Sequence, residues 1–285
     1  MSSKTNTVRH ILQIACPDQS GLIAACTQVL AKAGANILDL TQHTATDIET
    51  FFLRALFECP ADSLNHIRQH IEELASHLSM TWQLHDANHK VRVALFGSKT
   101  DHCLYELLLG QRDGDLACEF SCIVSNHAVL EPVARQFNIP FFLVPSNQPK
   151  IDQENRFREI LAGSSSEAVV MARYMQILSP EFTAEWAHKV INIHHGFLPA
   201  FKGAKPYHQA WAKGVKIIGA TAHFATQDLD QGPIIWQSVQ QVPDTCSIDR
   251  FIQIGKDVEK RTLSTALRLW LERRVFEHGG RTFIL

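Results

Sequence analysis

The chain has 285 residues, of which 45% are hydrophobic and 20% charged, so we expect a globular protein with two domains. A net charge of −2 offers no basic surface for nucleic acid or an anionic membrane, and no apolar run is long enough to cross a bilayer. The seven cysteines include no CxxC pair, which argues against a disulfide framework or a zinc site. We therefore expect a cytoplasmic protein that needs no metal and binds neither nucleic acid nor a membrane.

The first 86 residues are expected to form one small unit with the element order βαββαβ, which is that of a ferredoxin-like fold. Its strands alternate or carry β-branched residues, and its helices place apolar residues three to four apart. Gly34 is expected to end the first helix. The expected strands cover residues 8–16, 36–44, 51–59 and 80–87, and the helices begin after Gly21 and at Ala61.

Residues 87–90 are polar and read as a linker, and residues 91–285 form the second expected unit. Strands here are separated by 10- to 15-residue helices, a pattern typical of βαβ units in an open parallel sheet. We expect the tail, residues 281–285, to add a last edge strand. The expected strands cover residues 91–97, 116–125, 140–145, 167–175, 190–193 and 216–224, and the helices cover 102–109, 130–137, 153–163, 180–187 and 246–274.

Polar side chains follow two of these apolar runs. Asn192 and His194 come at the end of the strand that starts at Val190, and Asp230 follows the run that ends at Phe224. Because chemistry in open α/β sheets is built at the carboxyl ends of strands, we expect the three groups at neighbouring loops. An amide can stabilise an oxyanion, an imidazole can exchange protons near neutral pH, and a carboxylate can hold water or the imidazolium. Taken alone, an Asn-x-His at a strand end is more often a loop cap.

The stretch PDQSGLIAACTQVLAKAGANILDL resembles the start of an ACT domain, a small-molecule sensing module. The resemblance implies that an amino-acid effector binds near Asp18, Gly21, Leu22 and Asn36, between paired domains of a homo-oligomer, either a dimer or a tetramer. The alternative is that the two glycines only punctuate the helix and the unit is a dimerisation scaffold without a ligand.

The stretches INIHHGFLPAFKGAKPYHQAW and GATAHFATQDLDQGPIIWQ resemble the formyltransferase family that handles 10-formyltetrahydrofolate. The resemblance covers roughly residues 91–285 and implies a Rossmann-like, mostly parallel sheet. It implies Asn192, His194 and Asp230 as the catalytic residues, with His223 in support. It further implies that the folate contacts these residues: Met175, Gln176, Ile177, Thr226 and Asp228.

The loop FGSKTDHCLYELL bears on the formyl acceptor. Family members that use a nucleotide acceptor need a Gly-Ser-Asn run here to cradle its phosphate; this chain lacks it and carries Asp101 instead. The resemblance therefore implies transfer to water, giving formate and tetrahydrofolate without a cofactor. His102 and Cys103 match this pattern and either seal the water site or cap the helix.

Two other functions remain open. One is formyl transfer to a small amine such as glycinamide ribonucleotide. The other is a catalytically silent regulator that binds folate or an amino acid, which Gly196, standing where the family pattern has serine, slightly favours. His195 is expected to pack within its loop, and Lys202 and Lys205 either meet the folate tail or are solvated.

Overall fold

The computed structural model describes residues 6–199 and 206–285, so Lys202 and Lys205 lie outside the described residues. Contacts between residues divide the chain into two compact units. The N-terminal unit holds the residues up to His89 together with Arg273–Phe276 and Phe283–Leu285. The second unit holds Lys90–Glu272 and Glu277–Thr282.

The N-terminal unit has the expected βαββαβ order, with one antiparallel sheet in the order β2-β3-β1-β4. The helices α1 and α2 bury their apolar stripes, among them Leu22, Leu30, Ile67 and Ile71, in one core with the sheet. The second helix starts as a 3₁₀ turn, so the regular helix begins three residues later than expected. The elements are β1 (Thr7–Pro17), α1 (Leu22–Lys32), β2 (Asn36–Ala45), β3 (Thr50–Pro60), η1 (Ala61–Ser63), α2 (Leu64–Leu78) and β4 (Thr81–Asp86).

The C-terminal tail does not extend the main sheet, so the prediction of an edge strand was wrong. Instead β12 (Val275–His278) and β13 (Arg281–Ile284) pair with each other in a two-stranded sheet. The prediction that all of residues 91–285 form the second unit needs the same correction, because Phe276, Phe283 and Leu285 pack on Phe52 of β3. These tail residues cover a large apolar side chain on β3 that belongs to a different cluster from the helix-covered core.

We expect Phe52→Ala to lower the unfolding free energy of the N-terminal unit by roughly 3–5 kcal/mol, the usual cost of removing a buried phenyl ring. The Phe52 ring is fully buried, with its centroid 5.6 Å from that of Phe276 and 4.6 Å from that of Phe283. Urea unfolding measures the loss. Ile23→Ala, on the exposed side of α1, is the control, and a loss for Phe52→Ala no larger than for this control would contradict the assignment.

The second unit is built on a seven-stranded sheet in the order β11-β10-β9-β8-β5-β6-β7. From β9 to β7 the strands are parallel, which confirms the expected mostly parallel α/β sheet. The strands are β5 (Val91–Gly97), β6 (Cys118–Ser125), β7 (Phe141–Leu143), β8 (Ala168–Met171), β9 (Val190–His194), β10 (Ile217–Phe224) and β11 (Ile234–Gln241). The helices are α3 (His102–Asp113), η2 (Ala128–Leu130), α4 (Glu131–Gln136), α5 (Lys150–Gly163), α6 (Pro180–Glu185), α7 (Pro206–Ala212) and α8 (Ile248–Leu271).

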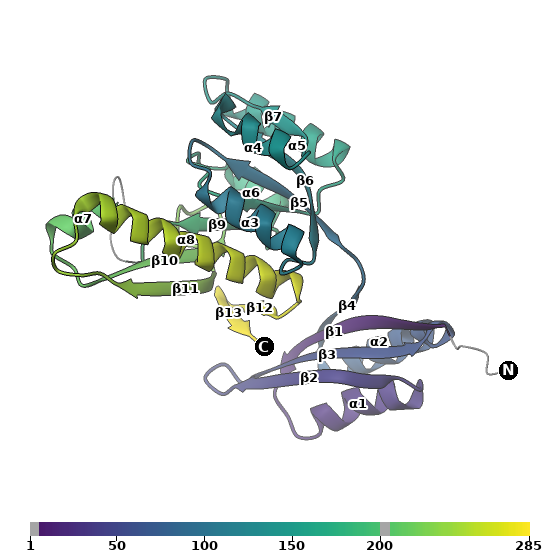
Figure 1. Ribbon diagram of the computed structural model, residues 1–285. Coiled ribbons are helices and arrows are strands. Elements are labelled where there is room, and N and C mark those ends of the chain that lie inside the picture. Colours follow the sequence, from purple (N-terminus) through teal and green to yellow (C-terminus); the bar gives the residue numbers. More distant parts are fainter. Residues whose placement is uncertain (1–5, 200–205) are drawn as a thin grey trace. The chain divides into compact units, whose positions relative to one another are not determined.

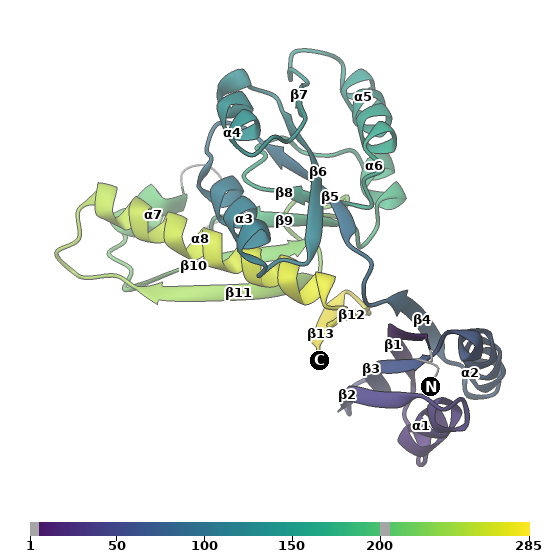
Figure 2. The same ribbon diagram turned by 45° about the vertical axis from the view of Figure 1, so that its right-hand side comes forward.

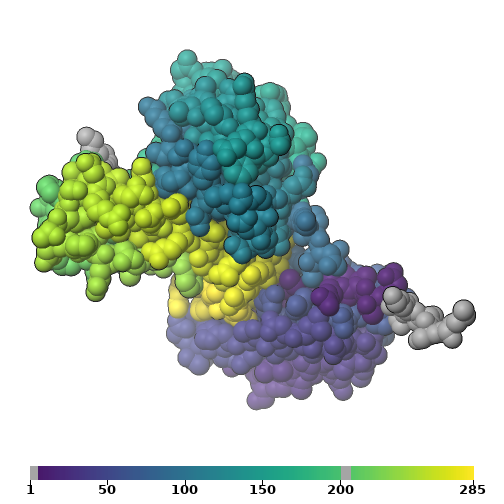
Figure 3. Space-filling view, viewed as in Figure 1, coloured from purple at the N-terminus to yellow at the C-terminus, as the bar shows by residue number. Residues whose placement is uncertain are grey.

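Helices cover both faces of this sheet (Figures 1 and 2). On one face α3 lies beside the long α8, which packs on β9, β10 and β11. On the other face α5 buries Phe157 against Phe96, and Phe182 of α6 packs on Phe157. In the space-filling view α8, in yellow-green, is visible along much of its length, so one side of this helix is exposed (Figure 3).

The strand β10 runs antiparallel to β9, so it is not one of the parallel strands of this mostly parallel sheet. The described part of the chain between them forms one helix, α7. His223 pairs with Asn192, and Phe224, at the end of β10, pairs with Ile191 near the start of β9. The carboxyl end of β10 therefore lies beside the amino end of β9, yet Asp230 from the following loop reaches His194. The loop after β10 begins at the amino end of β9 and runs back along it.

Candidate active site

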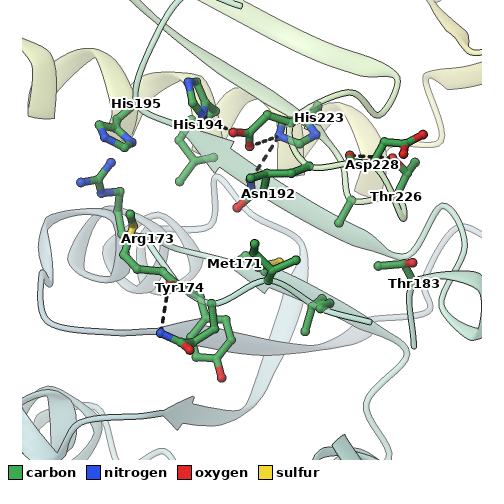
Figure 4. A pocket seen from close by; sticks show the side chains of 18 residues that line it. Met171, Arg173, Tyr174, Thr183, Asn192, His194, His195, His223, Thr226 and Asp228 are labelled. Atoms are coloured by element: carbon green, nitrogen blue, oxygen red, sulfur yellow. Dashed lines mark hydrogen bonds and ion pairs between the residues drawn. The ribbon is translucent and has the colours of Figure 1, made fainter. Parts of the chain in front are cut away.

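A cavity of about 340 Å³ opens at the ends of β8 and β9, within the usual range for small-molecule sites (Figure 4). Three segments line it: the end of β8 with the loop after it, the end of β9, and His223 with the loop after β10. These segments bring together the residues Asn192, His194, His223, Asp230, Met175, Gln176, Ile177, Thr226 and Asp228, every one of them a predicted site residue.

His194 and Asp230 form a close pair in this cavity. The His194 Nδ1 atom lies 3.1 Å from Asp230 Oδ2, and the two side chains are 6% and 18% exposed. Because a carboxylate only accepts, Nδ1 carries the proton and the Nε2 atom of a neutral ring is free of one. That Nε2 atom is buried and has no hydrogen-bond partner among the described residues. The pair therefore presents a basic nitrogen in the wall of the cavity.

Burial raises the pKa of Asp230, but the hydrogen bond that His194 donates outweighs it and leaves the pKa well below its usual value. Asp230 is therefore ionised at neutral pH. A fixed negative charge beside His194 stabilises the protonated imidazole. The arrangement suits an imidazole that gains and loses a proton in turn.

Asn192 is oriented by His223. The His223 Nδ1 atom is 2.9 Å from the backbone carbonyl of Phe224, so it donates to that oxygen and leaves Nε2 as the acceptor of a neutral ring. Asn192 Nδ2 lies 3.1 Å from this Nε2 and donates to it. One hydrogen on Asn192 Nδ2 thus fixes the amide, and the second remains available in the cavity.

The loop that carries Asp230 is held closed at its base. The Phe224 amide donates to the Pro233 carbonyl at 3.0 Å. Only glycine fits at position 232, because a Cβ there would lie 1.8 Å from the Phe224 carbonyl oxygen. Asp230 itself has a φ of 56°, a conformation that costs a non-glycine residue on the order of 1 kcal/mol or more. The loop thus holds Asp230 in an unfavourable backbone conformation, and this conformation places its carboxylate in the cavity.

The loop after β8 forms another wall of the cavity. Met175 and Ile177 line the cavity and expose 58% and 59% of their surface, so they present apolar side chains there. The Met175 amide donates to Ser98 Oγ at 3.0 Å, which ties this loop to the end of β5. On the opposite loop, Thr226 Oγ1 donates to the carbonyl of Asp228.

His102 and Cys103 do not line the cavity, although both are described. They stand at the start of α3, where His102 Nε2 lies 2.8 Å from Oε2 of Glu259 on α8. Sequence reasoning missed Glu259 and its other partners, Arg173 and Tyr207. A glutamate among the apolar positions of α8 and an arginine directly after a buried strand were the available signals.

His102, Cys103 and Glu259 present ligand atoms within 4.8 Å of one another, a spacing that a metal ion could use. The chemistry argues otherwise. Glu259 already shares its charge with the Arg173 guanidinium, whose Nε is 3.4 Å away. Burial, reinforced by Glu259, raises the pKa of the Cys103 thiol well above its usual value. We interpret the group as an ion-pair network.

In the N-terminal unit the four candidate effector residues play different parts. Leu22 is 3% exposed and belongs to the core. Gly21 adopts a φ of 90° directly before α1, a conformation that favours glycine. Asp18 accepts a hydrogen bond from Thr44 at 3.4 Å, and Asn36 donates to Glu58 at 3.4 Å.

Comparison with known proteins identifies the family of this chain. The formyl transferase family model matches residues 91–267, and the ACT domain model matches residues 10–75. A formyltetrahydrofolate deformylase from Corynebacterium sp. is 40% identical over 281 residues, which are 98% of this chain and 98% of that protein. The chain belongs to the formyltetrahydrofolate deformylase family. A Bacillus subtilis deformylase is 39% identical over 96% of this chain and 92% of its own.

Solved structures agree with this membership of the deformylase family. The deformylase from Pseudomonas syringae superposes with a TM-score of 0.91 at 40% identity, covering 98% of this chain and 95% of that one. Glycinamide ribonucleotide transformylase 1 from Symbiobacterium toebii has a TM-score of 0.66 at 27% identity, covering 69% of this chain and 95% of its own. The deformylases therefore match both units of this chain at higher identity, whereas the transformylase spans only part of it.

Burial, helped by the charge of Arg173, lowers the pKa of His195 in this deformylase-family site to about 4. In the unfolded chain a histidine takes up its proton near pH ~6.5. The unfolded state thus binds more protons between these pH values, and stability falls as pH drops from about 6.5 to about 4. We expect His195→Gln to reduce this loss by about 1 kcal/mol in urea unfolding at pH 7.5 and 5.5. The exposed His208→Gln is the control, and equal losses in wild type and His195→Gln would contradict the prediction.

Proposed function

We propose that this protein hydrolyses 10-formyltetrahydrofolate to formate and tetrahydrofolate, with water as the formyl acceptor and no cofactor. Relatives about 40% identical over nearly the whole chain carry the name formyltetrahydrofolate deformylase. The observation that carries the proposal in this chain is the His194–Asp230 pair with its unpartnered Nε2 atom in the cavity wall.

In the proposed mechanism, His194 Nε2 takes a proton from water as the water oxygen attacks the formyl carbon. Asp230 stabilises the imidazolium that forms and keeps Nδ1 as the donor. The second N–H of Asn192 donates to the oxyanion of the tetrahedral intermediate. The imidazolium then gives its proton to N10, the C–N10 bond breaks, and formate and tetrahydrofolate leave.

The folate is proposed to bind along the loops after β8 and β10, which carry Met175, Gln176, Ile177, Thr226 and Asp228. The exposed side chains of Met175 and Ile177 offer apolar surface for the pterin ring, and the backbone of this loop offers hydrogen bonds. Thr226 and Asp228 offer polar contacts from the opposite side.

The competing function is formyl transfer to glycinamide ribonucleotide, supported by the likeness to transformylases such as that of Symbiobacterium toebii. A reaction in H₂¹⁸O with that amine present separates the two. Hydrolysis predicts formate with one solvent oxygen, at a rate that the amine does not change. Formation of formylated amine, with formate falling in proportion, would contradict the proposal.

We also propose a cytoplasmic homo-oligomer, a dimer or tetramer joined through ACT-type units, with an amino-acid effector near Asp18, Gly21, Leu22 and Asn36. The match of the ACT domain model to residues 10–75 supports it. All seven cysteines are free, as expected in a reducing compartment. Among the described residues, no helix is both long enough and apolar enough to cross a membrane. A monomer in light scattering at micromolar concentration would contradict the oligomer.

A further inference from the structure

A buried carboxylate lies behind one wall of the cavity. Glu259 is 1% exposed and is not a lining residue, whereas Arg173, its partner, lines the cavity and is 15% exposed. The Arg173 Nε atom lies 3.4 Å from Glu259 Oε2. Arg173 therefore stands between the carboxylate and the cavity.

The Glu259 carboxylate is ionised, and other residues of the chain pair with it by charge and by hydrogen bonds. His102 Nε2 lies 2.8 Å from Oε2, and the Tyr207 hydroxyl donates to Oε1. Burial raises the pKa of Glu259, but the His102 hydrogen bond and the Arg173 charge outweigh it, so the pKa lies below its usual value. A buried carboxylate without such partners would be strongly unfavourable, so this one needs a cation.

Arg173 lies beside Glu259 in a strained backbone conformation. Its φ is 64°, a left-handed conformation worth roughly 1–3 kcal/mol of strain in a non-glycine residue. Its Nε and Nη1 atoms are buried and make no hydrogen bond to a described residue, so charge holds it beside Glu259. Figure 4 shows its guanidinium beside the His195 imidazole, at the same end of the cavity.

The network also joins separate elements around the site. Glu259 and Gly255 are on α8, Tyr207 on α7, His102 on α3 and Arg173 after β8. A Cβ at position 255 would lie 2.4 Å from Cζ of Tyr207, so this glycine leaves room for the ring to reach Glu259. The chain thus holds the Glu259 carboxylate beside the cavity and supplies the Arg173 guanidinium as its cation.

We propose that Arg173 is a specificity determinant that keeps amines from acting as formyl acceptors, because its guanidinium occupies the position beside Glu259 that an ammonium group would take. The inference rests on the proposed function. Water is neutral and needs no such position, so hydrolysis proceeds. A primary amine would be recognised there as its ammonium ion, and at that position the Glu259 carboxylate is already paired with Arg173.

Removing Arg173 is therefore expected to open a second reaction. A primary amine bound beside Glu259 would lose one proton to solvent, and its nitrogen would attack the formyl carbon. The C–N10 bond would break and the second amine proton would pass to N10. The products would be an N-formyl amine and tetrahydrofolate, so atoms and charge balance.

The test uses Arg173→Gly, which suits the left-handed backbone, with methylamine or glycinamide and 10-formyltetrahydrofolate. The ratio of formylated amine to formate is measured by mass spectrometry. We expect a ratio at least about tenfold above wild type, equivalent to about 1.4 kcal/mol of discrimination. The matched controls are Arg173→Lys, which keeps the cation, and Arg173→Gly with Glu259→Gln, which removes the anion as well. Both are expected to give the wild-type ratio.

An unchanged ratio in folded Arg173→Gly would overturn the proposal, as would an equal rise in the double variant. If Arg173→Gly does not fold, Arg173→Gln, which loses the charge but keeps a donor for Glu259, is scored in the same way. A rise in melting temperature of the Arg173 variant, but not of wild type, with methylammonium gives a second readout. The proposed hydrolysis is tested separately: it would be contradicted if the wild-type protein released no formate.

Discussion

His194→Ala is expected to lower kcat for formate release by about 10²–10⁴-fold, the usual contribution of a positioned acid–base group. The structure gives the reason, because the Nε2 atom of His194 is the basic nitrogen of the His194–Asp230 pair and no described residue uses it otherwise. Folate affinity should stay within about tenfold, since the folate is proposed to bind along other loops. Single-turnover formate release and folate titration measure the two effects.

The matched control is His66→Ala, an exposed histidine on α2, which should keep the wild-type rate. A near-normal rate in His194→Ala would remove His194 from the mechanism. A parallel loss of rate and of folate binding would instead indicate that this substitution disrupts the cavity.

Asp230→Asn is expected to lower kcat by about 10²–10⁴-fold while leaving the shape of the loop unchanged. The amide removes the negative charge that stabilises the His194 imidazolium, and its NH₂ group can donate to Nδ1 and so reverse the tautomer. Asp113→Asn, at the exposed end of α3, is the control. A wild-type rate in Asp230→Asn would contradict the role of Asp230.

Much of the fold followed from local patterns. The strand Val91–Gly97 and the helix α1 were predicted because apolar spacing and glycine positions act within a few residues. The direction of β10 could not be predicted in this way, because it depends on how the chain after His194 returns to the sheet. The tail hairpin was missed for a similar reason, since its partner Phe52 lies more than 200 residues away in the chain.

In the candidate site, too, some residues could be predicted from the sequence and others could not. His194 and Asp230 could be singled out because a family motif carries them, and the structure places them 3.1 Å apart. Arg173 and Glu259 have no local signal that couples them: one follows a strand and the other lies mid-helix, 86 residues later. Their pairing arises from packing of α8 over the sheet, which sequence spacing does not encode.

The most direct test of the central claim is a multiple-turnover assay with 10-formyltetrahydrofolate and no acceptor other than water. We expect formate and tetrahydrofolate in equal amounts over many turnovers of the wild-type protein, and a rate lower by about 10²–10⁴-fold in His194→Ala. Tight folate binding without formate release would contradict it. That result would indicate a transferase that lacks its acceptor or a silent folate-binding regulator.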